Sequence, residues 1–245
     1  MTRFIRRQPK IIFPVGFLLY RPPPLVLAPT FVRVAVDSGD GVTQIDLSID
    51  IDGADRCLIA SLSSDVTGTT TVTFDPAGPD EKTGTLIGST NFGGATQSDL
   101  FHVVGPVTGL GKTVRIATTT EIVGAVTARL YTGVDQTTPV GTAATASGES
   151  FTPSVTVTSA TGELVVDNVC HAGGGAGTPD ATQTERYDNI DVVDGSALGS
   201  DKAGAASVDM GWTIGEVAWA TVGASLKPAA VADELIQSRR AVIQP

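Results

Sequence analysis

The chain has 245 residues, of which 41% are hydrophobic but only 5% aromatic, and its net charge is −10 at neutral pH. This length allows one large domain or two small ones, with a sizeable buried core. The acidic balance argues against DNA or RNA as the main partner, because phosphate binding needs clustered Lys and Arg.

The charge is distributed unevenly along the chain. Residues 1–33 hold six of the 16 basic residues and no acidic one. Residues 34–245 therefore carry 10 basic against 26 acidic residues, a net charge of −16. The sequence thus predicts a basic, apolar, proline-rich arm (residues 1–30) joined to an acidic body (31–228).

The arm begins like a secretory signal peptide, with basic residues before an apolar stretch at 11–20. Pro14 interrupts this stretch, and Arg21 with Pro22–Pro24 follows it at once, without a small-x-small cleavage site. Ten apolar residues are too few for a membrane span, which needs about 20. Five prolines between residues 14 and 29 also exclude a continuous helix. We therefore expect a retained, extended segment.

Such an arm needs a surface to pack on, whether on its own body, a sister subunit or another protein. Ordering it costs about 1–2 kcal/mol per residue, which calls for much contact area. We therefore expect an intermolecular contact. The residues expected to bind the partner are Arg3, Phe4, Arg6, Arg7, Lys10, Phe13, Phe17, Leu18, Tyr20 and Arg21.

The body shows short β-type runs separated by Gly, Pro, Asp and Ser. Strands are expected at 31–37, 44–50, 57–63, 70–75, 85–88, 99–104, 112–118, 122–131, 153–159, 163–169, 184–188, 207–212 and 217–227. A turn is expected at 37–41, and loops at 76–98 (apart from one short strand) and 132–152. The pattern predicts an all-β fold, an antiparallel β-sandwich of the jelly-roll kind. Residues 229–245 are expected to form a C-terminal helix or tail.

Two of these strands carry further information. Residues 122–131 are apolar on both faces, which is typical of a central strand. In 217–227, small and aliphatic side chains alternate on one face while Trp219 lies on the other. We expect Trp219 in the core, with an interface as the alternative.

One glycine-rich stretch, GPVTGLGKT at 105–113, is similar to a phosphate-binding loop. That motif needs glycine where Pro106 stands, and a helix should follow it. The alternation after Lys112 is instead that of a strand, so a hairpin turn is expected.

Candidate metal ligands are few. A zinc site would have to combine Cys57, His102, Cys170 and His171, which show no ligand spacing. Acidic groups that could hold calcium are Asp50, Asp52 and Asp55, and Asp188, Asp191 and Asp194, but neither follows an EF-hand order. We expect no metal and no cofactor. The two cysteines are expected to be buried free thiols, with a disulfide as the alternative.

Catalytic motifs are also missing. There is no G-x-S-x-G, and neither histidine lies in a recognisable catalytic context. The sequence therefore predicts a protein that is not an enzyme.

The segments 131–167 and 207–228, with their GVDQTTPV, TPSVTVTSATGELVV and closing LKP sequences, resemble a β-sandwich module of phage virion proteins and bacterial surface proteins. The resemblance extends over about residues 30–228. Phage capsid decoration (cement) proteins combine a small β domain with an extended arm, and this chain resembles them.

The resemblance implies a structural virion protein on the capsid surface. Its partner would be the major capsid protein or another virion protein, and it would form a homotrimer, without contact with nucleic acid or a membrane. The alternative from another class is a carbohydrate- or receptor-binding module of a phage tail or a bacterial surface.

Overall fold

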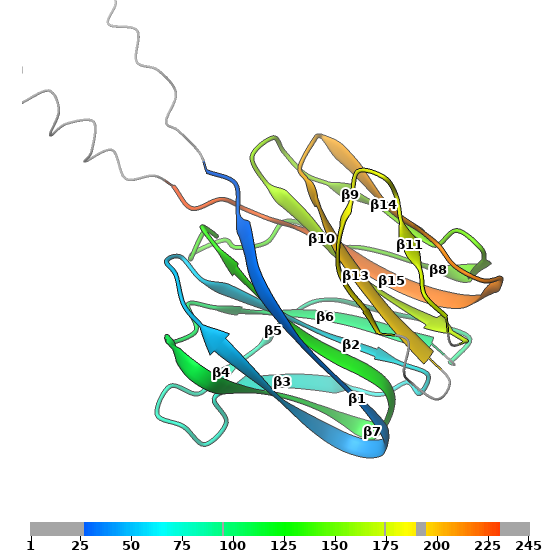
Figure 1. The fold of residues 1–245 in the computed structure, drawn as a ribbon, viewed down its shortest axis with the longest axis horizontal. Coiled ribbons are helices and arrows are strands. Elements are labelled where there is room, and N and C mark those ends of the chain that lie inside the picture. Colours follow the sequence, from blue (N-terminus) through cyan, green and yellow to red (C-terminus); the bar gives the residue numbers. More distant parts are fainter. Residues whose placement is uncertain (1–26, 95, 174, 190–194, 231–245) are drawn as a thin grey trace, which may run out of the picture. The chain divides into compact units, whose positions relative to one another are not determined.

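The computed structural model describes residues 27–94, 96–173, 175–189 and 195–230, whose regular structure is entirely antiparallel β-strand (Figure 1). These residues include no helix, and so none that could cross a membrane. Their strands are β1 (Thr30–Ile51), β2 (Cys57–Ser64), β3 (Thr70–Phe74), β4 (Lys82–Thr83), β5 (Thr85–Phe92), β6 (Thr96–Val104), β7 (Gly109–Thr132), β8 (Ala144–Ser150), β9 (Ser154–Thr158), β10 (Leu164–Ala172), β11 (Thr178–Pro179), β12 (Thr184–Asn189), β13 (Gly195–Ala203), β14 (Ser207–Thr213) and β15 (Val217–Leu226).

The first sheet is organised around its two longest strands, β1 and β7. They pair along nearly their whole length, from Thr30–Thr132 to Ile51–Gly109. On its other side β7 pairs first with β3 and then with β2, which gives the order β4-β3-β7-β2-β6-β5. The sheet curls into a nearly closed barrel, so that β3 approaches β6. We call the gap between β3 and the β5–β6 hairpin the seam.

The inner face of this sheet encloses the largest apolar core. Alternate residues of β1, β2 and β7 supply most of it, as expected for half of each strand facing inward. Its members are Ile45, Leu47, Ile49, Ile51, Leu58, Ala60, Leu62, Val72, Phe74, Phe101, Val103, Val114, Ile116, Ile122, Val126, Ala128 and Leu130.

A second sheet, in the order β12-β13-β10-β15-β8, packs against the outer face of β2, β5, β6 and β7. Cys57, Ile59 and Leu100 meet Val166 and Val222 in this contact. A third sheet, β11-β14-β9, covers the other face of the second sheet through two further apolar clusters. The second sheet is therefore buried on both faces, which explains why β10 and β15 have so few exposed residues.

Polar side chains also join the first two sheets. Asn168 of β10 donates from Nδ2 to the Leu62 carbonyl (3.0 Å) and to Ser98 Oγ (2.8 Å). Its Oδ1 accepts from Ser63 Oγ and from Tyr187. All five residues are buried, and these bonds satisfy polar groups that would otherwise be costly to bury.

Several expectations for strands are confirmed, among them the central position of 122–131 between β1 and β2. Others are wrong. Residues 37–41 are not a turn, because β1 runs through them with register shifts and a positive φ at Gly41. Residues 105–113 do not form a hairpin, because β6 and β7 are separated by β2 in the sheet. The expected loop 132–152 contains β8. Residues 76–98 contain β4, the start of β6 and all of β5, of which only 85–88 were expected as a strand.

Both described ends of the body lie side by side. Thr30 pairs with Thr132, and the backbone N–H of Ala229 donates to the Gly133 carbonyl (2.8 Å). A bridge between Val134 and Pro228 completes this contact. The chain thus enters and leaves the body at one place, beside the β7–β8 connection (Figure 1). We call this place the entry end.

Candidate functional site

The residues expected to bind a partner, from Arg3 to Arg21, lie outside the described residues, as does most of the expected C-terminal helix or tail (229–245). The first described basic residue is Arg33, close to the entry end. Its guanidinium pairs with Asp50 (3.3 Å) and Asp52 (2.5 Å). Two of the three acids in the first group considered for calcium, Asp50 and Asp52, are thus paired with an arginine.

The cysteines and histidines do not form one site. Cys57 lies at the start of β2, whereas the Cys170 thiol lies at the carbonyl of Ser64, at the end of the same strand (3.6 Å). Seven residues of strand span about 23 Å, far beyond the reach of a disulfide. Both thiols are free and buried, as expected. Burial raises the pKa of Cys57 to about 12 and raises that of Cys170 as well, so neither is a reactive thiolate.

The remaining metal candidates give no cluster among the described residues. Asp188 accepts a hydrogen bond from the Gly177 N–H (3.1 Å), and burial raises the pKa of its carboxyl group. Asp191 and Asp194 lie outside the described residues.

The stretch 105–113 has no phosphate-binding geometry. Gly105 donates its N–H to the Arg56 carbonyl, and strand β7, not a helix, begins at Gly109. The Lys112 ammonium is paired with Asp75 (3.1 Å). The lysine ammonium and the Gly105 N–H, which a phosphate-binding loop would offer to its ligand, are therefore bound to other groups of the body.

The two tryptophans are in the core. Trp212 and Trp219 belong to the cluster between the second and third sheets, and Trp219 donates to Ser150 Oγ (2.9 Å). The expectation of a core position for Trp219 is confirmed, which leaves no exposed tryptophan among the described residues as a sugar platform.

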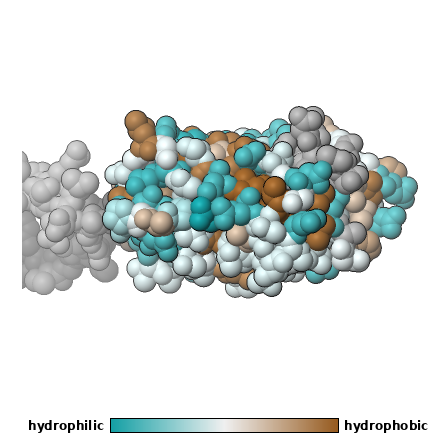
Figure 2. Space-filling model, turned by 90° about the horizontal axis from the view of Figure 1, so that it is seen from below, coloured by the Kyte–Doolittle hydropathy of each residue, from teal (hydrophilic) through white to brown (hydrophobic). Residues whose placement is uncertain are grey.

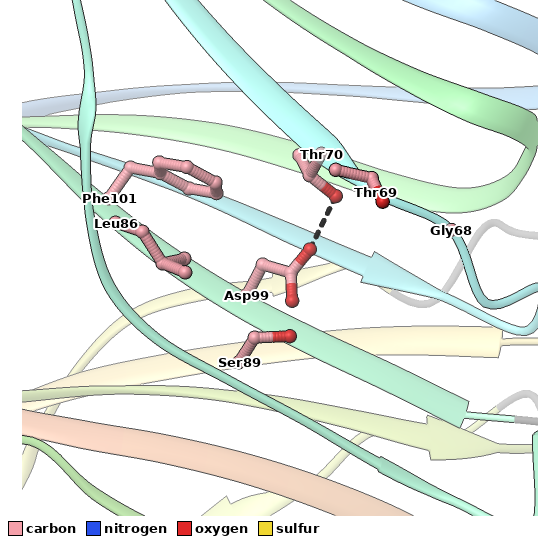
Figure 3. A pocket seen from close by; sticks show the side chains of 7 residues that line it. All are labelled: Gly68, Thr69, Thr70, Leu86, Ser89, Asp99 and Phe101. Atoms are coloured by element: carbon pink, nitrogen blue, oxygen red, sulfur yellow. Dashed lines mark hydrogen bonds between the residues drawn. The ribbon is translucent and has the colours of Figure 1, made fainter.

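The most distinctive polar feature is a half-open cavity of about 180 Å³ in the seam (Figure 3). Its lining comes from both sides of the seam and consists of Gly68, Thr69, Thr70, Leu86, Ser89, Asp99 and Phe101. The β5–β6 register explains this set: Leu86 is opposite Phe101 and Ser89 is opposite Asp99, with a bulge between the two pairs. The bulge keeps all four on the inner face.

Two side chains hold the seam together on either side of the cavity. Gln97 of β6 donates from Nε2 to the Gly68 carbonyl (2.8 Å) and accepts the Gly68 N–H at Oε1 (2.6 Å). Lys82 of β4 donates to the carbonyls of Val104 and Gly105 (both 2.8 Å). These bonds replace the strand pairing that would close the barrel, and they leave the cavity between them.

Asp99 lies deep in this cavity and is only 2% exposed. Its Oδ2 accepts from the Thr70 hydroxyl and from Gln97 Nε2 (2.6 Å). Its Oδ1 is buried without a hydrogen-bond partner in the structure. The Ser89 hydroxyl lies on that side (Figure 3), and as a hydrogen-bond donor it lowers the pKa of the carboxyl group, as Thr70 and Gln97 do. The larger effect, burial, raises this pKa.

Sequence reasoning missed this site. Residues 99–104 were expected to form a strand, and the alternation of Asp99, Phe101 and Val103 places the acid on an otherwise apolar, inward face. An aspartate on such a face was the available signal. The lining from Thr69 and Thr70 depends on the curl of the sheet, which no local pattern reveals.

Surface hydrophobic residues give no single docking face on the described body. The large exposed ones are scattered over several segments and are Leu27, Val36, Val42, Leu86, Leu110 and Phe151. Figure 2 shows one face on which hydrophobic patches alternate with polar areas.

No family model and no curated protein matches this chain. Among solved structures, the "Crystal structure of GK1651 from Geobacillus kaustophilus" is similar at 12% sequence identity, over 83% of this chain and 98% of that chain. The TM-score is 0.23, which is too low to bear on the fold or the function of this chain.

Proposed function

We propose that this chain is a structural virion protein of the capsid decoration class, which bridges capsid subunits through its N-terminal arm. The single observation that carries the proposal is the division between residues 1–33, with six basic and no acidic residues, and residues 34–245, with a net charge of −16. The arm would contribute cations and apolar side chains to a shell, and the acidic body would keep decorated particles apart in solution.

The entry end supports this arrangement. The described chain begins beside the place where it ends, next to Gly133 and Pro228. An arm that leaves from there would attach the body by one end and leave the rest of its surface free. One arm per body suits a homotrimer at a threefold position of a capsid.

The fold supports it in a second way. We propose that the stacked antiparallel sheets form a β-sandwich of the jelly-roll kind, with residues 1–30 as the extended arm and 229–245 as a helix or tail. Its described residues hold their own cores, and their exposed apolar side chains are scattered. The arm would then supply the apolar contact with the capsid. Burial of its apolar surface would contribute about 25 cal/mol of favourable free energy per Å², from which the cost of ordering the arm is subtracted.

The test is association with particles. Cultures that produce the protein would be fractionated on a density gradient, and the protein detected in the DNA-containing particle fraction with an antibody against the body. A variant with Arg3, Arg6, Arg7 and Lys10 all changed to Glu should move to the soluble fraction, because it reverses the charge of the arm. The matched control changes the three arginines to Lys and should stay with the particles.

The circular dichroism spectrum of both variants should be that of the parent, since the changes lie outside the described residues that form the β-strands. A protein that is absent from the particle fraction, or a charge-reversed variant that sediments like the parent, would refute the proposal.

A further inference from the structure

The seam cavity is a candidate binding site that is separate from the arm. It lies between β3 and the β5–β6 hairpin, and its lining includes the exposed Leu86 (51%) and the buried Asp99 (2%). A ligand would therefore meet an apolar side chain first and a carboxylate last.

The carboxylate at its base is not neutralised within the described body. The ion pairs there join other acids, namely Asp46, Asp50, Asp52, Asp75 and Asp201, to their arginines or lysine. Asp99 has only neutral neighbours: Thr70 and Gln97 bind Oδ2, and the Ser89 hydroxyl lies beside the carboxyl group. Its Oδ1 is buried and unpartnered. Burying an anionic oxygen without a partner costs free energy. A cationic donor that enters the cavity would therefore interact with this oxygen more favourably than it would in water.

The other groups of the lining fit the same chemistry. Near Asp99, the hydroxyl oxygen of Ser89 can accept a hydrogen bond, while Phe101 and Leu86 offer an apolar wall (Figure 3). An ammonium group has three donors and no acceptor, which suits a site of oxygen atoms. An alkyl stem would pack against Leu86 and Phe101. The face of the Phe101 ring can also attract the ammonium through a cation–π interaction.

We propose that the seam cavity binds a primary ammonium group on an alkyl stem, with Asp99 Oδ1 as its charged acceptor. A lysine side chain of a partner protein and a free alkylamine present the same chemistry. A neutral sugar would also find acceptors here, but it would leave the charge of Asp99 uncompensated. An anionic ligand would be repelled by it.

The experiment is a titration of the full, ¹⁵N-labelled chain at pH 8, where a primary amine with a pKa near that of lysine (~10.4) is charged. The probe is n-butylammonium chloride, and NaCl and n-butanol serve as matched controls for ionic strength and stem. We expect saturable shifts in the amide signals of Gly68, Ser89, Asp99 and Phe101 with the amine alone. A blocked lysine peptide, titrated in parallel, distinguishes the two sources: tighter binding than butylammonium indicates a protein side chain, and weaker binding a free amine.

Two variants test the role of the carboxylate. Asp99→Asn should weaken butylammonium binding at least tenfold, because it removes the charge but keeps the shape. Ser89→Ala, which leaves the carboxylate in place, should weaken it a few-fold and keeps the test available if the first variant does not fold. Asp46→Asn changes a half-exposed acid that is paired with Arg115 and should bind like the parent.

Four outcomes would overturn the proposal. They are equal affinity of parent and Asp99→Asn, equal shifts with n-butanol, saturation by NaCl alone, and saturation by a methyl glycoside where the amine has no effect. The last two would identify an alkali-cation site and a sugar site respectively.

Discussion

At the scale of single residues, the body buries charges in two different ways. Arg129 is fully buried, donates to the carbonyls of Asp167 (2.8 Å) and Ser200 (3.4 Å), and lies over the ring of Tyr187 at 5.2 Å. The Asp167 carboxylate, on the other face of β10, accepts from Trp212 Nε1 (2.8 Å) and from the Ser200 N–H (2.6 Å). These contacts tie the sheets together, whereas Asp99 keeps one oxygen free and joins nothing across layers.

This difference gives a pH-dependent prediction for Asp99. Burial raises the pKa of its carboxyl group in the folded state above the ordinary value of 3.8. Its contribution to stability is therefore complete below pH 3.8 and is lost as the pH rises through the raised pKa. The unfolding free energy of the parent minus that of Asp99→Asn should fall between pH 3 and pH 7, as measured by urea denaturation without added amines.

Asp46→Asn provides the control of opposite sign. The hydrogen bond from Arg115 lowers the pKa of Asp46, so its contribution is present above pH 3.8 and is lost as the pH falls. A difference for Asp99→Asn that rises with pH, like that of Asp46→Asn, would show that the folded body favours the charged form of Asp99.

At the scale of elements, the alternation of apolar residues predicts the inward faces well. Residues 44–50 were expected to form a strand, and their alternate residues Ile45, Leu47 and Ile49 lie in the first core. The continuity of β1 could not be predicted in this way. Residues 37–41 have turn composition, but pairing with the uninterrupted strand β7 extends them, and Gly41 takes up the irregularity with a φ of 69°.

Strands without apolar alternation were missed for a related reason. β8 has the sequence ATASGES and is held by backbone bonds to β15 at the edge of the second sheet. β13 has the sequence GSALGSDKA and is likewise held between β10 and β12. Their strand character comes from a neighbour that is distant in sequence, which is also why the seam cavity was not foreseen.

Strands β7 and β2 of the first sheet approach each other closely at Gly124 of β7. A Cβ atom there would lie 2.0 Å from the Ser63 carbonyl oxygen and 2.8 Å from the Ser64 Cα. β2 cannot easily move away from β7 to make room for a methyl group, because it pairs with β6 on its other side. Gly124→Ala should therefore lower the unfolding free energy by about 3 kcal/mol, as measured by urea denaturation.

Gly215→Ala is the matched control, since a Cβ at Gly215 would meet nothing within 4 Å. It should change the free energy by less than about 0.5 kcal/mol. Equal effects of the two substitutions would show that the close approach at Gly124 does not limit the sheet.

At the scale of the whole described body, three sheets are stacked, and the second lies between the first and the third. β10 contributes Val166 to the core against the first sheet and Val165 to the core against the third. Buried polar bonds from Asn168 add a second link to the first sheet. Loss of the third sheet would expose one whole face of the second, so the layers are expected to unfold together.

This coupling can be tested from the third sheet. Val157 of β9 is fully buried, and Val157→Ala should cost about 2 kcal/mol through lost apolar burial and the cavity left behind. If the body is one cooperative unit, hydrogen exchange of the β7 amides around Ile116, inside the first sheet, should accelerate by the factor that corresponds to this free energy, about thirtyfold. The exposed neighbour Thr156→Ala, whose hydroxyl donates to Asp209, should leave that exchange almost unchanged. Unchanged β7 exchange in Val157→Ala, with faster exchange confined to β9 and β14, would mean that the third sheet opens by itself and that only the first two sheets form the stable base of the body.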